Sequence, residues 1–165
     1  MSFVEISPYE LENSLKLIGK DWMLITAKDG ERVNAMTASW GCMGVLWNKP
    51  VAFGFVRPQR YTYGLVEAQE RVSLAFFDGK YREALNICGT KSGRDCDKLS
   101  LAGLSATDVD GVPVISEASL VLICRKLYVG DIEEQGFVDK SLLSNYKNAD
   151  YHRMYVFEIE HAYKK

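Results

Sequence analysis

Apolar residues along the chain fall in short runs in which they alternate with polar or small residues. In the segment 72–77, Val72, Leu74 and Phe76 occupy every second position, which is the period of a strand with one strongly apolar face. Runs of the same kind predict further strands over residues 21–28, 33–39, 41–46, 51–57, 118–132 and 155–160. Strands are therefore expected to make up most of the regular structure.

Helical periodicity is rarer. Tyr81, Ala84, Leu85 and Cys88 fall at positions i, i+3, i+4 and i+7, which is one face of an amphipathic helix. Short helices are also expected over residues 8–18, 62–68 and 139–146. The strands are not separated by regular helices of about 10–15 residues, so the pattern does not fit a doubly wound parallel sheet. It favours a mainly antiparallel barrel with helical insertions.

Single glycines and four prolines punctuate the chain. The Asp29-Gly30 pair is a strong signal for a hairpin between the first two predicted strands. The sequence Asn48-Lys49-Pro50 is expected to break the chain between the third and the fourth. No repeat, low-complexity segment or Pro/Ser-rich linker interrupts the pattern, so residues 1–165 are expected to form a single domain.

The composition narrows the function classes. The chain has 165 residues, of which 47% are apolar and 25% are charged, as in ordinary soluble globular proteins. A net charge of −2 offers no basic excess for a nucleic-acid backbone. Apolar runs such as Leu120–Cys124 are far shorter than the ~20 residues that span a membrane. Residues 1–10 show no charged-then-apolar leader pattern, so a cytoplasmic location is expected.

Cysteines and histidines are too widely spaced to suggest a metal or redox motif. The cysteines are Cys42, Cys88, Cys96 and Cys124, and none of them forms a CxxC pair. All four are expected to be free thiols, buried except for the one in the polar loop, Cys96. His152 and His161 lie nine residues apart in a predicted strand, which puts them on opposite faces. No metal site is predicted.

Several catalytic and nucleotide-binding motifs are absent from the sequence. No two glycines are spaced as G-x-G, so the dinucleotide fingerprint is missing. The sequence Thr90-Lys91-Ser92 looks like the end of a phosphate-binding loop, but Thr90 and Leu85 stand where the Walker A motif requires glycines. No G-x-S-x-G nucleophile elbow occurs. The sequence therefore nominates no protein acid, base or nucleophile.

Three segments combine residue types that can bind a ligand. The first, residues 34–41, reads Asn-Ala-Met-Thr-Ala-Ser-Trp-Gly and carries small and hydroxyl-bearing side chains where a core strand would be bulky. Small side chains would let a planar ligand approach the backbone, and the hydroxyls would orient it. The alternative is an edge strand with polar decoration.

The other two segments are turns that are rich in cations. In residues 57–63, Arg57 and Arg60 precede a predicted helix start at Thr62, where free N–H groups and the helix dipole favour a phosphate. Residues 89–98 hold two glycines, two hydroxyls and three cations that could close over an anion. The alternatives are a solvated turn in which Thr62 only caps the helix, and a surface loop between two helices.

Taken in order, these segments resemble the flavin reductase-like family of FMN-binding split barrels, and within it the flavoredoxin-like members. The shared features are the small-residue strand, the RPxRYT turn and the SGRDxDK loop, and the resemblance extends over residues 21–163. It implies a mainly β fold, a split β-barrel of antiparallel strands with Greek-key connections and short flanking helices. It also implies non-covalently bound FMN and a homodimer with the FMN near the subunit interface.

The resemblance implies cofactor contacts residue by residue. Along the isoalloxazine ring it implies Asn34, Met36, Thr37, Ala38, Ser39 and Trp40. Around the ribityl phosphate it implies Arg57, Arg60, Tyr61 and Thr62, and from the loop on the other side Lys91, Ser92, Gly93 and Lys98. His152 matches a histidine that faces the site at the start of the last strand, whereas His161 has no such match. Cys42 follows Trp40 by two residues, and a place near the ring is the alternative to a buried thiol.

The function that the resemblance implies is electron transfer by an FMN-dependent oxidoreductase. Electrons would pass between NAD(P)H or a redox partner protein and an acceptor such as free flavin, ferric iron or another protein, with the flavin supplying the redox chemistry. A carrier without substrate turnover of its own fits the same resemblance. Two alternatives stay open: a non-catalytic flavin- or haem-binding split barrel, and an enzyme that resembles pyridoxamine-phosphate oxidase. Neither a nucleic acid nor a membrane is expected as a partner.

Overall fold

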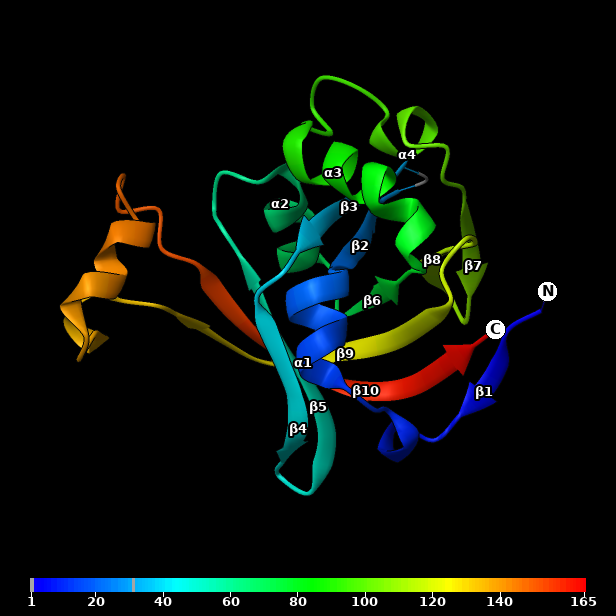
Figure 1. Ribbon diagram of the computed structural model, residues 1–165, viewed down its shortest axis with the longest axis horizontal. Coiled ribbons are helices and arrows are strands. Elements are labelled where there is room, and N and C mark those ends of the chain that lie inside the picture. The colour runs from blue at the N-terminus through cyan, green and yellow to red at the C-terminus, as the bar shows by residue number, and fades with distance from the viewer. Residues whose placement is uncertain (1, 31) are drawn as a thin grey trace.

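The computed structural model describes residues 2–30 and 32–165, and one curled antiparallel sheet dominates it (Figure 1). Its strands follow in the order β3-β2-β6-β9-β10-β5-β4, and β1 pairs with β10. Their bounds are β1 Val4–Ile6, β2 Met23–Asp29, β3 Arg32–Ala38, β4 Gly41–Leu46, β5 Lys49–Val56, β6 Arg71–Phe76, β9 Leu120–Asp131 and β10 Arg153–Lys164. This confirms the prediction of a mainly β, antiparallel architecture.

Short helices and a small hairpin surround the sheet. The helices are α1 Ser14–Lys16, α2 Tyr61–Ala68, α3 Arg82–Thr90 and α4 Lys98–Leu101, and the hairpin consists of β7 Ala106–Val109 and β8 Val112–Ile115. Figure 1 shows α3 and α4 over the end of the sheet that β2 and β3 form. Helix α2 contributes Leu65 and Val66 to the barrel core. Helix α3 buries Ala84, Leu85 and Cys88, the apolar stripe that its sequence predicts.

The central strands are buried on both faces. In β2, Met23 and Ile25 point into the barrel core, whereas Leu24 belongs to a second core that it shares with α3, α4 and β8. Strand β9 divides in the same way, with Leu122 in the barrel core and Ile123 in the second core. The period of two in these sequences therefore separates two cores rather than a core from solvent.

The predicted helix over residues 8–18 is wrong. A 3-10 turn at Pro8–Glu10 begins with a reciprocal capping box between Ser7 and Glu10 and ends at Leu11, where the backbone is extended. Asn13 then has a φ of 56°, which interrupts helical geometry before α1 begins. A single π-helical turn, Leu17–Asp21, completes the segment. The helix predicted over 139–146 is also only a 3-10 turn, Lys140–Asn145.

The expected break between the third and fourth predicted strands is present, but it lies at Trp47-Asn48 rather than at Asn48-Lys49-Pro50. The turn consists of Trp47 and Asn48, which both have positive φ, and Lys49 already begins β5. Two positive φ values in a two-residue loop match the right-handed twist of a hairpin. Pro50 lies opposite Val45 of β4, while the pairing of β5 with β10 begins only at Val51. The missing N–H of Pro50 therefore costs no bond to β10.

Strand β1, the β7–β8 hairpin and α4 are absent from the sequence-based prediction. The hairpin turns at Asp110-Gly111, with φ values of 52° and 79°. This is the same signal as Asp29-Gly30, which does join β2 to β3 with Asp29 opposite Arg32. The four-residue strands on either side of Asp110-Gly111 are too short to give a periodic pattern of their own.

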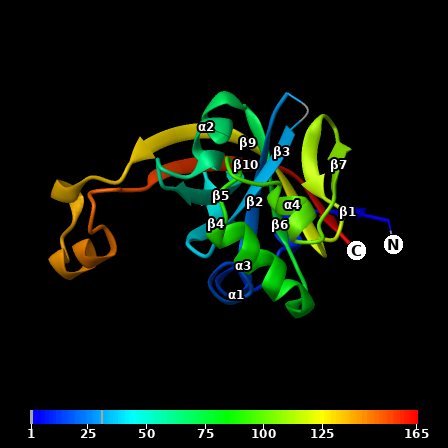
Figure 2. The ribbon, with the colours of Figure 1, turned by 90° about the horizontal axis from the view of Figure 1, so that it is seen from above.

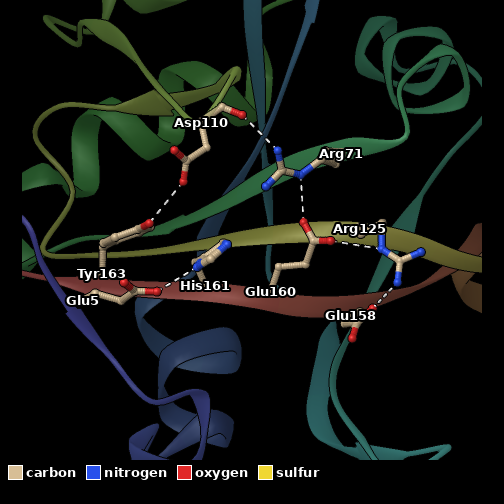
Figure 3. Close-up of polar contacts among 8 residues, drawn as sticks. All are labelled: Glu5, Arg71, Asp110, Arg125, Glu158, Glu160, His161 and Tyr163. Atoms are coloured by element: carbon tan, nitrogen blue, oxygen red, sulfur yellow. Dashed lines mark hydrogen bonds and ion pairs between the residues drawn. The ribbon is translucent and has the colours of Figure 1, made fainter.

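Ion pairs and hydrogen bonds between charged side chains connect strands β1, β6, β9 and β10 (Figure 3). Arg71 of β6 and Arg125 of β9 lie directly opposite each other, and Glu160 of β10 accepts from both, at 2.7 and 3.0 Å. Without this carboxylate the facing arginines would destabilise the pairing. Arg125 also pairs with Glu158, and His161 bonds to Glu5 of β1. The network secures β1, β6, β9 and β10 away from the predicted ligand-binding segments.

Residues 132–152 form an arm that stands out from the barrel between β9 and β10 (Figures 1 and 2). It contains an aromatic cluster of Phe137, Tyr146 and Tyr151, with Tyr146 and Tyr151 centroids 4.9 Å apart. Val138 in the arm is fully exposed. The arm therefore has a small core of its own and touches the barrel through its base.

Candidate functional site

The RPxRYT turn and the SGRDxDK loop meet at one cavity of about 160 Å³. Seven of the residues that the resemblance assigns to the cofactor line it: Arg60, Tyr61, Thr62, Lys91, Ser92, Gly93 and Lys98. Gln59 and Thr90 complete the lining, so it contains three cations and no carboxylate. We call this cavity the cradle. Two sequence motifs about 30 residues apart thus form one anion-attracting pocket.

The two innermost cations of the cradle are fixed by the end of α3. Lys98 is 3% exposed and donates from Nζ to the carbonyl oxygen of Cys88 at 3.0 Å. Arg60 donates to the carbonyls of Gly89 and Cys88 at 2.7 and 3.3 Å. These carbonyls carry the negative end of the helix dipole, so they stabilise both cations. Burial lowers the pKa of Lys98 to about 8, and the positive charge of Arg60 adds to this effect.

A close approach at Gly93 brings the loop onto β3 and α2. A Cβ atom at Gly93 would lie 2.3 Å from Asn34 Oδ1 and 2.6 Å from Cδ1 of Tyr61, so no other residue fits without displacement. Asn34 donates from Nδ2 to Oγ1 of Thr62 at 2.7 Å. The hydroxyl hydrogen of Thr62 then remains for another acceptor. Thr62 is the second residue of α2, and Arg60, not Thr62, holds the cap position.

Arg32 and Arg94 flank the ring of Tyr61, and neither is among the cofactor contacts that the resemblance implies. Each guanidinium carbon lies 5.4 Å from the centroid of the Tyr61 ring. Arg32 also donates to the carbonyl of Gly93, and Arg94 donates to that of Gln59 at 3.1 Å. The sequence signal for Arg94 was its place in the SGRDxDK loop. Arg32 gave no signal, because only the fold brings the start of β3 to this loop.

None of the five cations around the cradle has a carboxylate within 4.0 Å in residues 2–30 and 32–165. They are Arg32, Arg60, Lys91, Arg94 and Lys98. Asp97 in the same loop serves as the cap of α4, where it accepts from the Ser100 N–H at 3.1 Å. A cluster of unpaired cations in a chain of net charge −2 creates a local field that favours a polyanionic ligand.

Strand β3 lies at one end of the sheet and offers a free backbone edge. Its strand partner among the described residues is β2 alone. Met36 and Ala38 point into the barrel core, and the Thr37 hydroxyl donates to the carbonyl of Leu85 in α3. These side chains already make contacts inside the protein. The backbone groups along the free edge of β3 therefore remain available to a planar ligand. Ser39, which is half-buried, and Trp40 connect β3 to β4. Strand β4 is the last strand at the opposite end of the sheet order.

Trp40 and His152 lie together at the base of the arm. Their ring centroids are 5.2 Å apart, and Phe55 contacts the same imidazole edge-on. Nδ1 of His152 is 3.0 Å from the Tyr146 hydroxyl. Burial lowers the pKa of His152 to about 4, and Arg57 adds to this effect, so the imidazole is neutral at pH 7. Trp40 remains 46% exposed and presents an aromatic surface beside a neutral histidine.

Arg57 lies apart from the cradle, unlike the other assigned residues of its turn. Its guanidinium pairs with Asp150 of the arm, donates to the carbonyl of Asn145 at 3.0 Å and covers the ring of Tyr146. Gln59 donates to the same carboxylate at 2.7 Å. Arg57 therefore anchors the arm, and Arg60 is the arginine of this turn that lines the cavity.

The solvent exposure of the cysteines differs from the prediction at one position. Cys88 and Cys124 are fully buried, as expected, and Cys96 is half-buried in its loop. Cys42 is exposed, so the prediction of a buried thiol there is wrong. The reason is that β4 is the other end strand of the sheet, and alternate residues along it face solvent. In the described ranges, no group of three or more His, Cys, Asp or Glu side chains could hold a metal ion.

A larger cavity lies elsewhere, between the N-terminal segment and residues 116–120. It measures about 950 Å³ and is lined by four carboxylates and four lysines. Because these charges balance, it lacks the local positive field of the cradle. Separately, none of the described helices is long and apolar enough to cross a membrane.

Comparisons with known proteins identify the family of the chain. The sequence pattern of the "Flavin reductase like domain" family matches residues 16–164. No curated protein sequence matches the chain. Among solved structures, an FMN-binding domain of a flavin reductase-like enzyme from Shewanella baltica superposes with a TM-score of 0.73 at 15% identity. It covers 99% of this chain and 77% of its own.

Two further structures share the fold. Flavoredoxin from Methanosarcina acetivorans has a TM-score of 0.68 and 23% identity, over 88% of this chain and 68% of its own. An NADH:FAD oxidoreductase from Streptomyces globisporus has a TM-score of 0.65 and 14% identity, over 88% and 75%. These likenesses support the split-barrel architecture, and the family match covers nearly the whole chain. The chain belongs to the flavin reductase-like domain family.

Proposed function

We propose that this protein binds FMN and transfers electrons through it. The ribityl phosphate would lie in the cradle, where Arg60, Lys98 and the N-terminus of α2 supply charge-assisted donors. The observation that carries the proposal is the cavity itself, because it gathers three cations and four hydroxyl-bearing residues from two separate segments and has no carboxylate in its lining. A phosphate monoester is the chemistry that such a donor set fits best.

The isoalloxazine ring would extend from the cradle along the free edge of β3 towards Trp40. Backbone groups of residues 36–39 would hydrogen-bond the polar edge of the ring, since their side chains are largely committed to the cores and to α3. Trp40 and neutral His152 would form one wall. The flavin supplies hydride and electron transfer when bound, and the protein positions it and excludes water.

The electron donor that we propose is NAD(P)H or a redox partner protein, and the acceptor is free flavin, ferric iron or another protein. Family membership supports an oxidoreductase, and the relatives named above include both a flavoredoxin and an NADH:FAD oxidoreductase. We also propose a single-domain homodimer in the cytoplasm. Exposed Trp47 and Val45 on the β4–β5 hairpin would favour self-association, which light scattering would measure.

The test begins with the absorbance spectrum of the purified protein and with titration of flavin-free protein with FMN. Binding that is weakened in Lys98→Met but not in Lys147→Met, which changes an exposed lysine outside the cradle, would support the site. A protein that neither carries nor binds FMN would overturn the proposal. Anaerobic mixing of the loaded protein with NADH or NADPH then separates a reductase, whose flavin bleaches, from a carrier that only a partner protein reduces.

A further inference from the structure

Lys98 has the surroundings of a nucleophilic amine. Its side chain is 3% exposed and lines the cradle, so a reagent reaches Nζ through a cavity and not from the open surface. Burial, together with the positive charge of Arg60, lowers the pKa of Lys98 to about 8, so about half of these side chains carry a neutral amine at pH 8. An ordinary lysine, with a pKa of about 10.4, is less than about 1% neutral at the same pH. Desolvation beside a second cation is an arrangement that activates lysine nucleophiles.

The groups that face this amine leave it free to react. Nζ donates to the carbonyl oxygen of Cys88 at 3.0 Å, and no carboxylate lies within 4.0 Å of it in residues 2–30 and 32–165. The titratable groups nearby are Arg60 at the start of α2, the thiol of Cys88 at the end of α3 and the thiol of Cys96 in the loop before α4. Burial raises the pKa of the Cys88 thiol, so this thiol is uncharged at pH 8. The neutral amine is therefore not opposed by an ion pair with any described residue.

The cradle places a phosphate site directly beside this amine. Arg60 and Thr62 line it from the start of α2, and Lys91 and Ser92 line it from the loop. These groups can donate to phosphoryl oxygens, which leaves Lys98 as the nucleophile of the same cavity. The cavity measures about 160 Å³, so an electrophilic carbon must lie close to the phosphorus atom to meet Nζ. An acyl phosphate meets this requirement, because a single bridging oxygen separates its acyl carbon from phosphorus.

We propose that Lys98 is an acylation site, at which small acyl phosphates transfer their acyl group to Nζ. The neutral nitrogen attacks the acyl carbon, the bond from this carbon to the bridging oxygen breaks, and inorganic phosphate leaves. The nitrogen then loses one proton to solvent, and no oxidant or reductant takes part. Binding of the phosphate supplies the proximity that makes Lys98 react before other lysines. The inference goes beyond the proposed function, since it requires a phosphate in the cradle but not FMN.

Acylation would close the cradle to its phosphate ligand. The amide that forms is neutral, so the cavity loses one of its three cations and a charge-assisted donor. FMN and an acyl phosphate would also compete for the same cavity. Bound FMN should therefore protect Lys98, and acylated protein should bind FMN at least about tenfold more weakly.

The test treats flavin-free protein with acetyl phosphate at pH 8 and maps the acetylated lysines by peptide mass spectrometry. Lys147, which is exposed and lies outside the cradle, is the internal control. We expect Lys98 to react at least about tenfold faster than Lys147. The difference in neutral fraction from an ordinary lysine is about 100-fold, and the bound phosphate offsets part of it by raising the pKa of Lys98. Excess inorganic phosphate should slow the reaction of Lys98 and leave that of Lys147 unchanged.

A reagent without a phosphate shows whether the cradle directs the reaction. N-hydroxysuccinimidyl acetate delivers the same acetyl group, and its ratio of Lys98 to Lys147 acetylation should be at least about fivefold lower. Lys91→Met removes an exposed cation of the cradle, and it should slow the reaction of Lys98 with acetyl phosphate more than that with the ester. Lys147→Met, which removes an exposed lysine outside the cradle, should change neither reaction of Lys98.

Three results would overturn the proposal: equal ratios with the two reagents, preferential acetylation of Lys91, or no protection by inorganic phosphate. Each of them is separate from FMN binding. If FMN does not bind but acetyl phosphate selects Lys98, the proposed function falls and the acylation site stands. If FMN binds and Lys98 is not selected, only the acylation site falls.

Discussion

Nζ of Lys98 lies 3.0 Å from the carbonyl oxygen of Cys88, and this bond holds a buried cation at the C-terminal end of α3. The cation is costly to bury, as its lowered pKa of about 8 reflects. Removing it should therefore not destabilise the fold, because the helix end keeps Arg60 as a donor to the same carbonyl. A charged side chain that lowers the stability of the fold and is nevertheless kept is typical of a binding residue.

Replacing Lys98 by Met should separate binding from stability. A charge-assisted hydrogen bond to the phosphate is worth about 1.5–3 kcal/mol, so we expect FMN affinity to fall about 10–100-fold. The urea midpoint should stay at or above that of the parent protein. Isothermal titration and urea unfolding measure the two effects, with Lys147→Met as the control. A variant that binds FMN like the parent protein would contradict the cradle.

The pH dependence of FMN binding should report the same lysine. In flavin-free protein Lys98 loses its proton near pH 8, whereas a bound phosphate keeps it charged. Affinity should therefore fall as the pH rises above about 8, and by up to about tenfold per pH unit. Lys98→Arg, whose guanidinium stays protonated, should flatten the profile between pH 7.5 and 9.5. Fluorescence titrations across this range test it, and an unchanged slope in Lys98→Arg would count against the assignment.

Two Gly→Ala variants test the close approach of the loop to β3. In Gly93→Ala the new Cβ would meet Asn34 and Tyr61, so we expect a loss of about 1–3 kcal/mol in unfolding free energy and weaker FMN binding. Gly64→Ala, in the middle of α2, meets nothing within 4 Å and should gain about 0.5–1 kcal/mol. Urea unfolding of both variants checks the contrast. Equal effects would mean that the loop does not pack as described.

His152 should make the fold sensitive to acid. Its pKa is about 4 in the folded state and about 6.5 in the unfolded state, so the unfolded chain binds more protons between these values. The contribution of His152 to the free energy of unfolding is complete above pH 6.5. It decreases as the pH falls towards 4, by about 3 kcal/mol at most. Urea unfolding at pH 7, 5.5 and 4.5 measures the decline. His152→Phe should lessen it, whereas His161→Gln, at the half-exposed histidine on β10, should retain it.

Releasing the arm should expose it to proteolysis. Asp150 accepts from both Arg57 and Gln59, so Asp150→Ala removes both anchors at once. We expect cleavage within residues 132–151 to become several-fold faster, because the arm keeps fewer contacts with the barrel. Limited trypsin digestion with mass mapping measures the rate. The control is Asp108→Ala, which removes an ion pair with Lys28 and the acceptor of the Gly111 N–H, both outside the arm.

Local chemistry made much of this protein predictable from its sequence. The central strands follow from a period of two, α3 from its apolar stripe, and the β2–β3 hairpin from Asp29-Gly30, because side-chain direction and turn geometry depend on neighbours in sequence. The three candidate ligand-binding segments were also visible as residue types. Asp110-Gly111, which closes the β7–β8 hairpin, is a local turn signal of the same kind.

Tertiary structure decided how those segments combine. Arg32 reaches Gly93 across 61 positions in the chain, and no local pattern marks such a contact. The two arginines of the RPxRYT turn diverge because each finds a distant partner: Asp150 draws Arg57 to the arm, and the end of α3 draws Arg60 to the cradle. The sequence by itself determined which residues can attract a phosphate, whereas the fold decided which of them face one cavity. The physical reason is that charge and size belong to each residue, but burial and pairing arise only when distant segments pack together.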